Sequence, residues 1–272
     1  MDGIVDLPRI LKTIQQLDDF DVICLQEVAV NFSGLPGSQG EDQFAELSAG
    51  LPEYTAIYGP ATDFPDKNGD NKKRRLFGNA IFSRLPVGQI WRHPLPWVTE
   101  PASPSMQRML IEAVVFTDMA PIRVMTTHLE YYSQHQRALQ VEAIRRLHDA
   151  ACLMSSRPSH SDKQNGPFEV FQRPSQAILC GDMNFTATAQ EYLEILAPFD
   201  NKTPCFYDAR SIMYPGEPHA ATVGIQPLSF VDQPKCFDHI FITDGLLNSL
   251  KAHQVDAVTQ ASDHQPVWIE LQ

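Results

Sequence analysis

Amphipathic segments alternate with short apolar ones along most of the chain. The first amphipathic segment follows Asp6, which can cap a helix, and it has Pro8 in its first turn. Its apolar residues recur at helical spacing, at Leu7, Ile10, Leu11, Ile14 and Leu17. The pattern therefore predicts a helix here, followed by a turn at Asp18 and Asp19.

The strand signals are short runs rich in Val, Ile and Phe that end abruptly in polar residues. They predict strands at 20–25, 54–58, 79–83, 88–93, 109–116, 122–127, 177–180, 237–242 and 267–271. Two more amphipathic segments predict helices at 44–51 and 134–153. Regions 60–78, 155–175 and 201–234 are rich in turn-forming or polar residues, so we expect them to be mostly loop.

This order of elements predicts a strand-rich α/β protein with two packed sheets and helices outside. No repeat of solenoid period is evident in the sequence. Region 155–175 is the only candidate boundary, and the polar motifs on both sides of it belong to one expected site. We therefore expect a single domain over residues 1–272.

Composition and charge narrow the function classes. The chain is 43% hydrophobic and 20% charged, which is ordinary for a globular protein and wrong for a disordered one. Its 21 Lys and Arg against 33 Asp and Glu give a net charge of −12, which argues against a protein that coats nucleic acid. An enzyme with carboxylates gathered at a metal site is still compatible with this balance.

Cysteine usage and hydropathy bear on the compartment. The five cysteines are scattered, with no CxxC pair, and no apolar stretch approaches the roughly 20 residues that span a bilayer. The first residues lack the basic flank and apolar run of a signal peptide. We therefore expect a cytoplasmic protein with no stable membrane insertion.

Five predicted strands begin or end in polar residues that packing does not require. These residues are Gln26, Glu27, His128, Asp182, Asn184, Asp238, Asp263 and His264. Strand ends are rigid, and side chains there can face a crevice. Carboxylate, amide and imidazole groups suit a hard divalent cation, and magnesium is favoured over zinc because no Cys or His pair has zinc-ligand spacing.

Taken one at a time, these residues also have structural interpretations. His128 is compatible with a satisfied core histidine, and Asp238 with one half of a structural ion pair. The 181–184 and 263–264 segments are compatible with plain turns. The run Lys72 to Arg75 is most simply a solvated loop. Only the combination favours catalysis.

The set of motifs resembles the endonuclease/exonuclease/phosphatase superfamily, which has the DNase I-like fold. The matching stretches follow the family's order: LQE at 25–27, GNAIFSR at 78–84, THL at 127–129, GDMN at 181–184, FDHIF at 237–241 and SDH at 262–264. The resemblance covers nearly the whole chain. It implies a four-layered α/β sandwich, with two mixed β-sheets face to face and helices outside, and metal-dependent hydrolysis of a phosphate ester.

The resemblance also implies roles around the metal and the attacking water. Glu27 would be the principal metal ligand and Asp263 a second one, with Mg²⁺ as the cofactor and Mn²⁺ able to substitute. Asp182 would position and deprotonate the water. Asn184 would hold that aspartate and the phosphate.

Two histidines and an arginine would complete the site. By the resemblance, His264 would contact the scissile phosphate or act as general acid or base, and Asp238 would fix its tautomer. His128 would be a second imidazole facing the phosphate. Arg108, just before a predicted strand, is a further candidate for phosphate binding or a surface residue.

The start of the chain departs from the family pattern. Family members usually begin with a strand that ends in an Asn at the metal site, whereas here the first predicted helix follows almost directly after Met1 and no Asn precedes Asn31. The first strand is therefore apparently missing: the start of the chain is assigned too late, the chain is trimmed, or the protein lacks this strand. Its absence would leave backbone groups that must be covered or paired in trans, and would weaken metal binding and activity.

The leading functional hypothesis is a divalent-metal-dependent hydrolase of a phosphomono- or phosphodiester. The acidic balance favours a small or lipid-derived substrate. A nuclease is the alternative enzyme, with Lys72 to Arg75 beside Phe77, and Trp91 with Trp97, as candidate contacts to nucleic acid. A catalytically weak binding module that keeps the fold is the alternative from another class.

Overall fold

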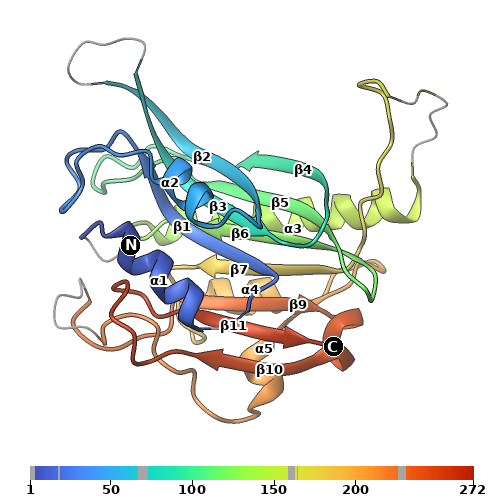
Figure 1. Ribbon diagram of the computed structural model, residues 1–272. Helices are drawn as coiled ribbons and strands as arrows, with labels where there is room; N and C mark the ends of the chain where they lie inside the picture. Colours follow the sequence, from blue (N-terminus) through green and yellow to red (C-terminus); the bar gives the residue numbers. More distant parts are fainter. Residues whose placement is uncertain (1–3, 18, 67–72, 159–162, 164, 226–230) are drawn as a thin grey trace.

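A six-stranded mixed sheet forms the centre of the molecule. The computed structural model describes residues 4–17, 19–66, 73–158, 163, 165–225 and 231–272. The strand order in this sheet is β4 (Val87–Pro94), β5 (Met109–Phe116), β6 (Pro121–His128), β7 (Ala177–Asp182), β9 (Asp238–Thr243) and β8 (Phe206–Asp208) (Figure 1). The two central strands, β6 and β7, are parallel, and their register places His128 opposite Asp182.

Two small antiparallel sheets form a second layer. One has the order β1 (Val22–Val30), β3 (Arg74–Ser83) and β2 (Thr55–Pro65), and the other pairs β10 (Leu250–Val255) with β11 (Val267–Leu271). Among the described residues, no ladder joins these two sheets. Their apolar side chains, such as Ile81 and Ile269, share one core with Ile111 and Ile242 of the central sheet. The second layer is therefore split into two parts.

Helices cover both outer faces of this sandwich. Helices α3 (Gln134–Ser156) and α4 (Gln190–Leu196) pack over the six-stranded sheet, where Ile144 and Ile195 meet Leu179. Helices α1 (Leu7–Leu17) and α2 (Gln43–Gly50) pack on the β1–β3–β2 sheet, and α5 (Ala209–Met213) and the 3-10 helix η1 (Asp244–Ser249) are short. The layers are thus helix, sheet, sheet and helix, and the expected DNase I-like fold class is confirmed.

Local sequence signals set several of these element ends. The Asp6 carboxylate accepts a hydrogen bond from the N–H of Arg9 at 3.0 Å, as expected of a capping residue. Ser133 caps α3 in the same way, through the N–H of Gln136 at 3.1 Å. Among the described residues, none of these helices is long and apolar enough to cross a membrane.

The expected loop at 60–78 is wrong over most of its length. Strands β2 and β3 continue through it as a long hairpin, and residues 67–72 lie outside the described part of the chain. The hairpin is held by an ion pair between Arg74 and Asp63 at 2.7 Å and by Arg75, which lies over the ring of Phe64. Pro, Gly and Asp give this region a low intrinsic strand propensity, but pairing between the two strands overrides that propensity.

Region 201–234 also holds structure that we did not expect. Strand β8 and helix α5 lie in it, and α4 and β10 elsewhere were likewise missed. These elements have at most seven residues, and α4 has no side-chain cap at Ala189. They form because they pack on the sheet, since elements so short have little intrinsic stability.

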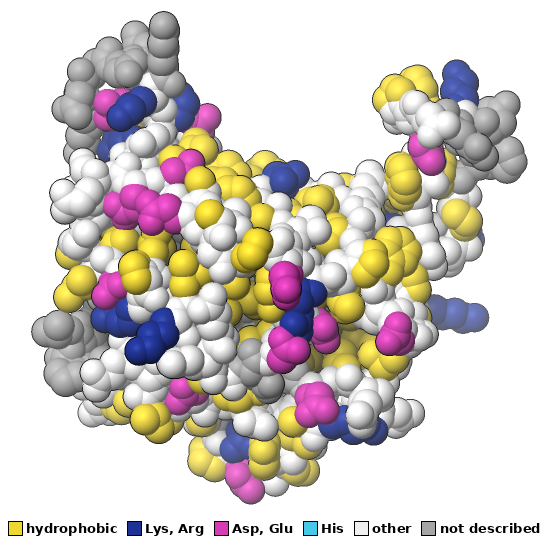
Figure 2. All heavy atoms as spheres, in the orientation of Figure 1, with side chains coloured by type: hydrophobic (Ala, Val, Ile, Leu, Met, Phe, Trp, Pro, Cys, Tyr) yellow, Lys and Arg dark blue, Asp and Glu magenta, His cyan; other side chains and the backbone are white. Residues whose placement is uncertain are grey.

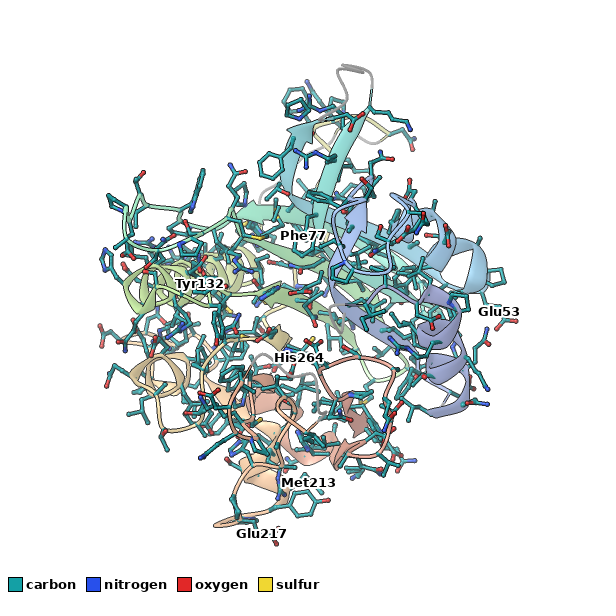
Figure 3. All side chains as sticks on the ribbon, turned by 90° about the vertical axis from the view of Figure 1, so that its left-hand side faces the viewer. Glu53, Phe77, Tyr132, Met213, Glu217 and His264 are labelled. Atoms are coloured by element: carbon teal, nitrogen blue, oxygen red, sulfur yellow. The ribbon has the colours of Figure 1, made fainter. Side chains whose placement is uncertain are left out.

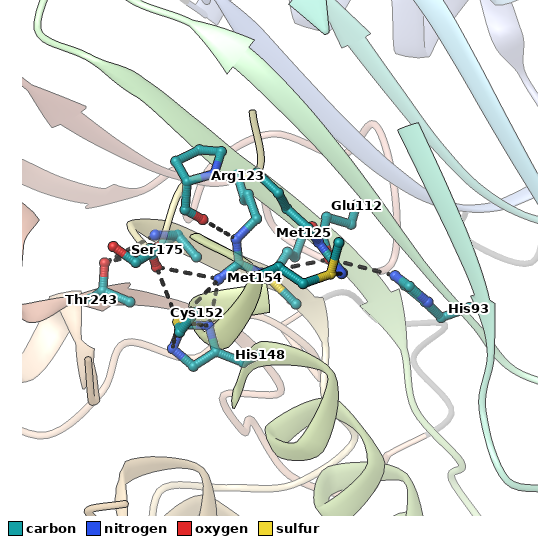
Figure 4. Close-up of polar contacts among 12 residues, drawn as sticks. His93, Glu112, Arg123, Met125, His148, Cys152, Met154, Ser175 and Thr243 are labelled. Atoms are coloured by element: carbon teal, nitrogen blue, oxygen red, sulfur yellow. Dashed lines mark hydrogen bonds and ion pairs between the residues drawn. The ribbon is translucent and has the colours of Figure 1, made fainter. Parts of the chain in front are cut away.

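A buried polar network ties β5 and β6 to helix α3 and to the segment that precedes β7 (Figure 4). Arg173 donates two hydrogen bonds to the carboxylate of Glu112, at 2.7 and 2.8 Å. Arg123 lies 3.6 Å from the same carboxylate and 2.7 Å from Nδ1 of His148 on α3. Burial would raise the pKa of Glu112, but the hydrogen bonds from Arg173 and His93 and the charges of Arg123 and Arg173 together lower it to about 2.

Candidate active site

The polar residues at the strand ends meet on one face of the sandwich. Figure 3 looks onto this face, and His264 lies centrally, between Phe77 of β3 above and Met213 of α5 below. The site draws on β1 from the second layer, on β6, β7 and β9 from the central sheet, and on the segment before β11. Segments far apart in the sequence therefore converge here.

An ion pair between His264 and Asp238 anchors the site. Nδ1 of His264 lies 2.8 Å from Oδ2 of Asp238, the first residue of β9. A short segment at 222–223 holds both residues in place. The hydroxyl of Thr222 accepts a hydrogen bond from the N–H of Asp238 at 3.2 Å, and Val223 forms a β-bridge with His264. Sequence analysis missed Thr222, because nothing in its neighbourhood signals an extended segment.

Asp182 is buried and faces both imidazoles. Its Oδ2 lies 3.4 Å from Nε2 of His128 and 3.8 Å from Nε2 of His264. Its Oδ1 accepts a hydrogen bond from the N–H of Asn184 at 2.9 Å. The Asn184 amide in turn donates to the carbonyl oxygen of Leu129 at 2.9 Å. One oxygen of the carboxylate is thus held by the Asn184 N–H, and the other faces the two imidazoles.

The turn after β7 requires unusual backbone conformations. Gly181 has φ +136°, and a Cβ at this position would collide with the carbonyl oxygen of Thr127 on β6. Asn184 is left-handed, with φ 52°. Glycine is needed because β6 approaches this closely, and asparagine is among the residues that adopt the left-handed region most readily.

Glu27 reaches the site from the second layer. It lies where the β1–β3 register shifts, between Leu25 and Val28, and its φ is 60°. Its Oε1 lies 3.8 Å from Nδ1 of His128. A left-handed glutamate costs of order 1–3 kcal/mol, and such strain clusters at functional sites. The bulge turns the carboxylate toward the central sheet.

Burial and charge shift the pKa values of the central groups. Burial raises the pKa of Asp182 to about 7, helped by the charges of Asp238 and Glu27 and opposed by His264. Burial alone would lower the pKa of His264, but its ion pair and hydrogen bond with Asp238 raise it to about 10. His264 is therefore a cation at neutral pH, beside a carboxyl group that titrates near neutrality.

The other ionisable groups of the site are shifted as well. Burial would raise the pKa of Glu27, but surrounding positive charge, including that of His264, brings it to about 2. Burial raises the pKa of Asp263, and the charge of Glu27 adds to the effect. Burial and the charge of Arg108 hold the pKa of His128 well below its ordinary value.

Arg108 is buried, with 6% of its surface exposed. Its Nε lies 3.5 Å from Oε2 of Glu130, while its Nη1 has no hydrogen-bond partner among the described residues. Burial lowers the pKa of Arg108, and the charges of Glu130, Asp182 and Glu27 oppose that effect. Arg108 is therefore a buried residue close to Asp182 and Glu27, and it does not lie on the outer surface. Sequence analysis missed its partner Glu130, although Glu130 follows the THL motif directly.

Within the described part of the chain, two groups of side chains have the spacing of metal ligands. One is Asp182, Asp238 and His264, and the other is Asp208, His219 and His239. In the second group, the buried carboxylate of Asp208 already accepts hydrogen bonds from Tyr192 and Ser211, both at 2.8 Å, and pairs with His219. We interpret that group as structural.

The carboxylates of the first group, with Glu27 and Asp263 nearby, could hold a divalent cation, whereas the protonated imidazole of His264 could not be a ligand. The Glu27 charge raises the pKa of Asp263, so two carboxyl groups here repel each other when both are ionised. A cation between them would remove this repulsion. The donors are oxygen-rich and contain no thiolate, which fits a hard cation.

The fold and the site together define a class: a two-sheet α/β sandwich with carboxylates, imidazoles and a buried arginine at its strand ends. The profile of the endonuclease/exonuclease/phosphatase family matches residues 5–264. The chain therefore belongs to this family, whose members are hydrolytic enzymes acting on phosphoesters. No curated protein sequence matches the chain.

Solved structures share the fold at low sequence identity. A mannosyl-6-phosphatase from Bacteroides thetaiotaomicron is 18% identical, with a TM-score of 0.65 over 98% of this chain and 90% of its own. An endonuclease/exonuclease/phosphatase from Beutenbergia cavernae is 22% identical, with a TM-score of 0.63 over 99% of this chain and 67% of its own. The human Nocturnin catalytic domain, solved with a bound sulfate anion, is 16% identical, with a TM-score of 0.58 over 98% and 85%.

Proposed function

We propose that this protein is a divalent-metal-dependent hydrolase of a small or lipid-derived phosphoester. The observation that carries the proposal is the continuous series of contacts from Glu27 through His128, Asp182 and His264 to Asp238. It joins a candidate metal ligand to a candidate base and a charged imidazole within one site.

Asp182 suits the role of general base toward the attacking water. A catalytic base works best when its pKa lies near the operating pH, and burial raises that of Asp182 to about 7. The N–H of Asn184 holds one carboxylate oxygen, so the other is directed between the two imidazoles. The amide of Asn184 would also contact the phosphate.

His264 suits charge stabilisation or proton donation at the phosphate. Asp238 keeps its imidazole protonated and fixes Nδ1, so that Nε2 is the atom that faces the site. A fixed cation stabilises the charge that develops on the phosphoryl oxygens or on the leaving oxygen. His128 and the unpaired Nη1 of Arg108 would add contacts to the same oxygens.

Glu27 and Asp263 would hold the metal, with Mg²⁺ as the expected ion and Mn²⁺ as a substitute. When bound, the ion supplies neutralisation of the phosphate charge. Glu27 is already ionised at neutral pH, with a pKa of about 2, so it needs no deprotonation to bind a cation. Asp263 has a raised pKa, and it would lose its proton once a cation binds nearby.

The surface charge supports a small substrate over a long nucleic acid. The net charge is −12, and Lys and Arg are interspersed with Asp and Glu on the face in Figure 2. Arg74 is paired with Asp63, and the ring of Trp91 is covered by Arg173, 4.5 Å from its centroid. Two of the candidate nucleic-acid contacts are therefore engaged within the protein, although Trp97 is exposed and Lys72 lies outside the described residues.

The test is a panel of phosphoesters assayed with Mg²⁺ and with Mn²⁺. The panel includes sugar phosphates, because one structural neighbour is a mannosyl-6-phosphatase, together with lipid-derived phosphodiesters, oligonucleotides and plasmid DNA. We expect turnover of a small phosphoester. Asp182→Ala and His264→Ala should each lower it by roughly 100-fold or more.

Exposed residues of the same types supply the controls. Asp200→Ala and His135→Ala lie outside the site and should retain full turnover. Salt-sensitive cleavage of nucleic acid alone would favour the nuclease alternative. Absence of turnover across the panel, with calorimetry showing no metal binding, would contradict the proposal and favour a binding module.

A further inference from the structure

Two tyrosines lie beside the active site, on the loop between β6 and α3. Tyr132 is 61% exposed, and Figure 3 shows it on the face that holds His264. Its ring meets that of Tyr131 at 88°, with the centroids 4.9 Å apart. Tyr131 in turn meets Phe237, the residue before β9, edge to face at 6.5 Å. The two tyrosine rings form a small aromatic surface, here called the aromatic shelf, with Phe237 packed against it.

The start of the loop is bonded to the turn that carries the expected catalytic base. The N–H of Leu129 donates to the carbonyl oxygen of Asp182 at 2.9 Å, and the carbonyl oxygen of Leu129 accepts from the amide of Asn184 at 2.9 Å. Tyr131 follows Leu129 by two residues, and two residues of chain span at most about 7 Å. The backbone of the shelf therefore lies close to that of the expected catalytic residues.

The carboxylate of Glu130 connects the shelf to Arg108. Its Oε2 lies 3.5 Å from Nε of Arg108, and its Oε1 accepts a hydrogen bond from the N–H of Tyr132 at 3.0 Å. Nη1 of Arg108 is buried and has no hydrogen-bond partner among the described residues, so it can donate to an oxygen of a substrate phosphate. One side chain thus separates the shelf from a group expected to bind the phosphate.

Side chains of α3 hold the loop in one conformation. Arg137 donates hydrogen bonds to the carbonyl oxygens of Glu130 and Tyr131, at 2.9 and 3.1 Å, and is itself held by Glu191 at 3.0 Å. The buried amide of Gln140 accepts a hydrogen bond from the N–H of Glu130 at 2.9 Å. A loop fixed in this way presents its rings already oriented, so binding of a ligand costs less conformational entropy.

The chemistry of the shelf restricts what it can bind. Aromatic faces stack on flat rings, and they also pack against the C–H groups of a sugar ring. A long acyl chain would need more apolar area than two rings supply, and the tyrosine hydroxyls add polar atoms at their edges. A small ring that carries hydroxyl or amine groups matches this surface.

We propose that the aromatic shelf is the subsite for the leaving group, and that it selects phosphoesters of a small ring, either a pyranose or a nucleoside, over linear phosphoesters. The ring of Tyr132 stacks on the leaving group, and Tyr131 borders it on one side. This inference rests on the proposed function, because it takes the phosphate to lie between Arg108 and His264.

Binding is measured by calorimetry with Mg²⁺ and an Asp182→Asn variant, so that no probe is turned over. The probes are glucose 6-phosphate, adenosine monophosphate, glycerol 3-phosphate and inorganic phosphate. We expect at least one cyclic probe to bind about tenfold or more tightly than glycerol 3-phosphate. Adding Tyr132→Ala should remove this advantage and leave the affinity for inorganic phosphate unchanged, whereas Tyr132→Phe should keep the advantage.

Tyr207→Ala is the matched control, because Tyr207 is an exposed tyrosine on β8, outside the site. Saturation-transfer NMR provides a second readout. Irradiation of the protein's aromatic protons should transfer saturation to the ring protons of the bound probe. The signal should be lost with Tyr132→Ala and kept with Tyr207→Ala.

Two results would overturn the proposal: equal affinity for the cyclic and linear probes, and a cyclic preference that Tyr132→Ala leaves intact. Tighter binding of glucose 6-phosphate than of adenosine monophosphate would assign the subsite to a pyranose, and the reverse order would assign it to a nucleoside. Failure of inorganic phosphate to bind would count against the proposed function. The shelf is then tested with methyl glucoside and adenosine, which carry no phosphate, and absence of saturation transfer to both would overturn it.

Discussion

The contact between His264 and Asp238 sets the charge of the imidazole that faces the phosphate. Its raised pKa of about 10 depends on that carboxylate, since burial alone would lower it. We predict that Asp238→Asn moves the alkaline limb of the kcat/KM profile from near pH 10 toward the ordinary histidine value of about 6.5. Imidazole NMR titration of His264 measures the same shift without substrate.

The pH dependence of the free energy of unfolding should report the same ion pair between His264 and Asp238. Because the folded-state pKa of His264 is raised, its stabilising contribution is fully present below about pH 6.5 and lost as the pH rises through about 10. The Asp238→Asn variant should lose this decrease in stability at alkaline pH. An unchanged pH profile in both kcat/KM and stability would show that Asp238 does not control the imidazole.

Gly181 is a second position where a single side chain decides the geometry of the site. We predict that Gly181→Ala destabilises the fold by more than about 1 kcal/mol and displaces Asp182, because a Cβ would meet the Thr127 carbonyl oxygen at φ +136°. Gly34→Ala is the control, since nothing lies within 4 Å of its Cβ position. Urea unfolding compares the two. Equal stabilities would contradict the close approach of β6 and β7.

At the scale of elements, the Glu112 network joins β5 and β6 to α3 and to the segment before β7. We predict that Glu112→Ala lowers the free energy of unfolding by about 3–5 kcal/mol, because Arg123 and Arg173 would then be buried without a counter-charge. The exposed pair of Glu142 and Arg146 is the control, and Glu142→Ala should cost less than about 1 kcal/mol.

Low pH should weaken the ion pairs that Glu112 makes with Arg123 and Arg173. The pKa of Glu112 is lowered to about 2, so its stabilising contribution is present above its ordinary value of 4.5 and is lost as the pH falls toward 2. Wild-type stability should fall through this range more steeply than that of Glu112→Ala. Parallel curves for the two proteins would argue against an ionised Glu112 in the core.

The whole molecule should respond to the metal, because the expected ligand Glu27 lies on β1 and the expected ligand Asp263 lies in the segment before β11. A ligand that binds only the folded state at 100 times its Kd stabilises by about 2.7 kcal/mol, which corresponds to roughly 5–10 °C in Tm here. We predict such a rise with Mn²⁺ or Mg²⁺. Glu27→Gln should abolish it.

Glu53→Gln is the control for this measurement, because Figure 3 shows Glu53 at the far edge of the face that holds His264. Its Tm should rise with metal as in the wild type. If Glu27→Gln and an Asp263→Asn variant both kept the full rise, the metal would bind elsewhere.

Local patterns and motifs in the sequence were sufficient to predict the class of fold and to name the candidate site residues. Periodicity found the helices that begin at Leu7 and Gln134 and most strands of the central sheet, since these are long and pack on one face. The motif residues Glu27, Asp182, Asp238 and His264 were found because polar groups at strand ends have no packing role. Their catalytic roles stay predictions.

Features that depend on contacts between distant segments emerge only in the folded chain. The β2–β3 hairpin, β8 and β10 form through pairing and packing that no local pattern encodes. Thr222 became recognisable only once it lay against Asp238, and Glu130 only beside Arg108. Strands remote in sequence bring such residues together only when the chain is folded, so no local pattern could have placed them.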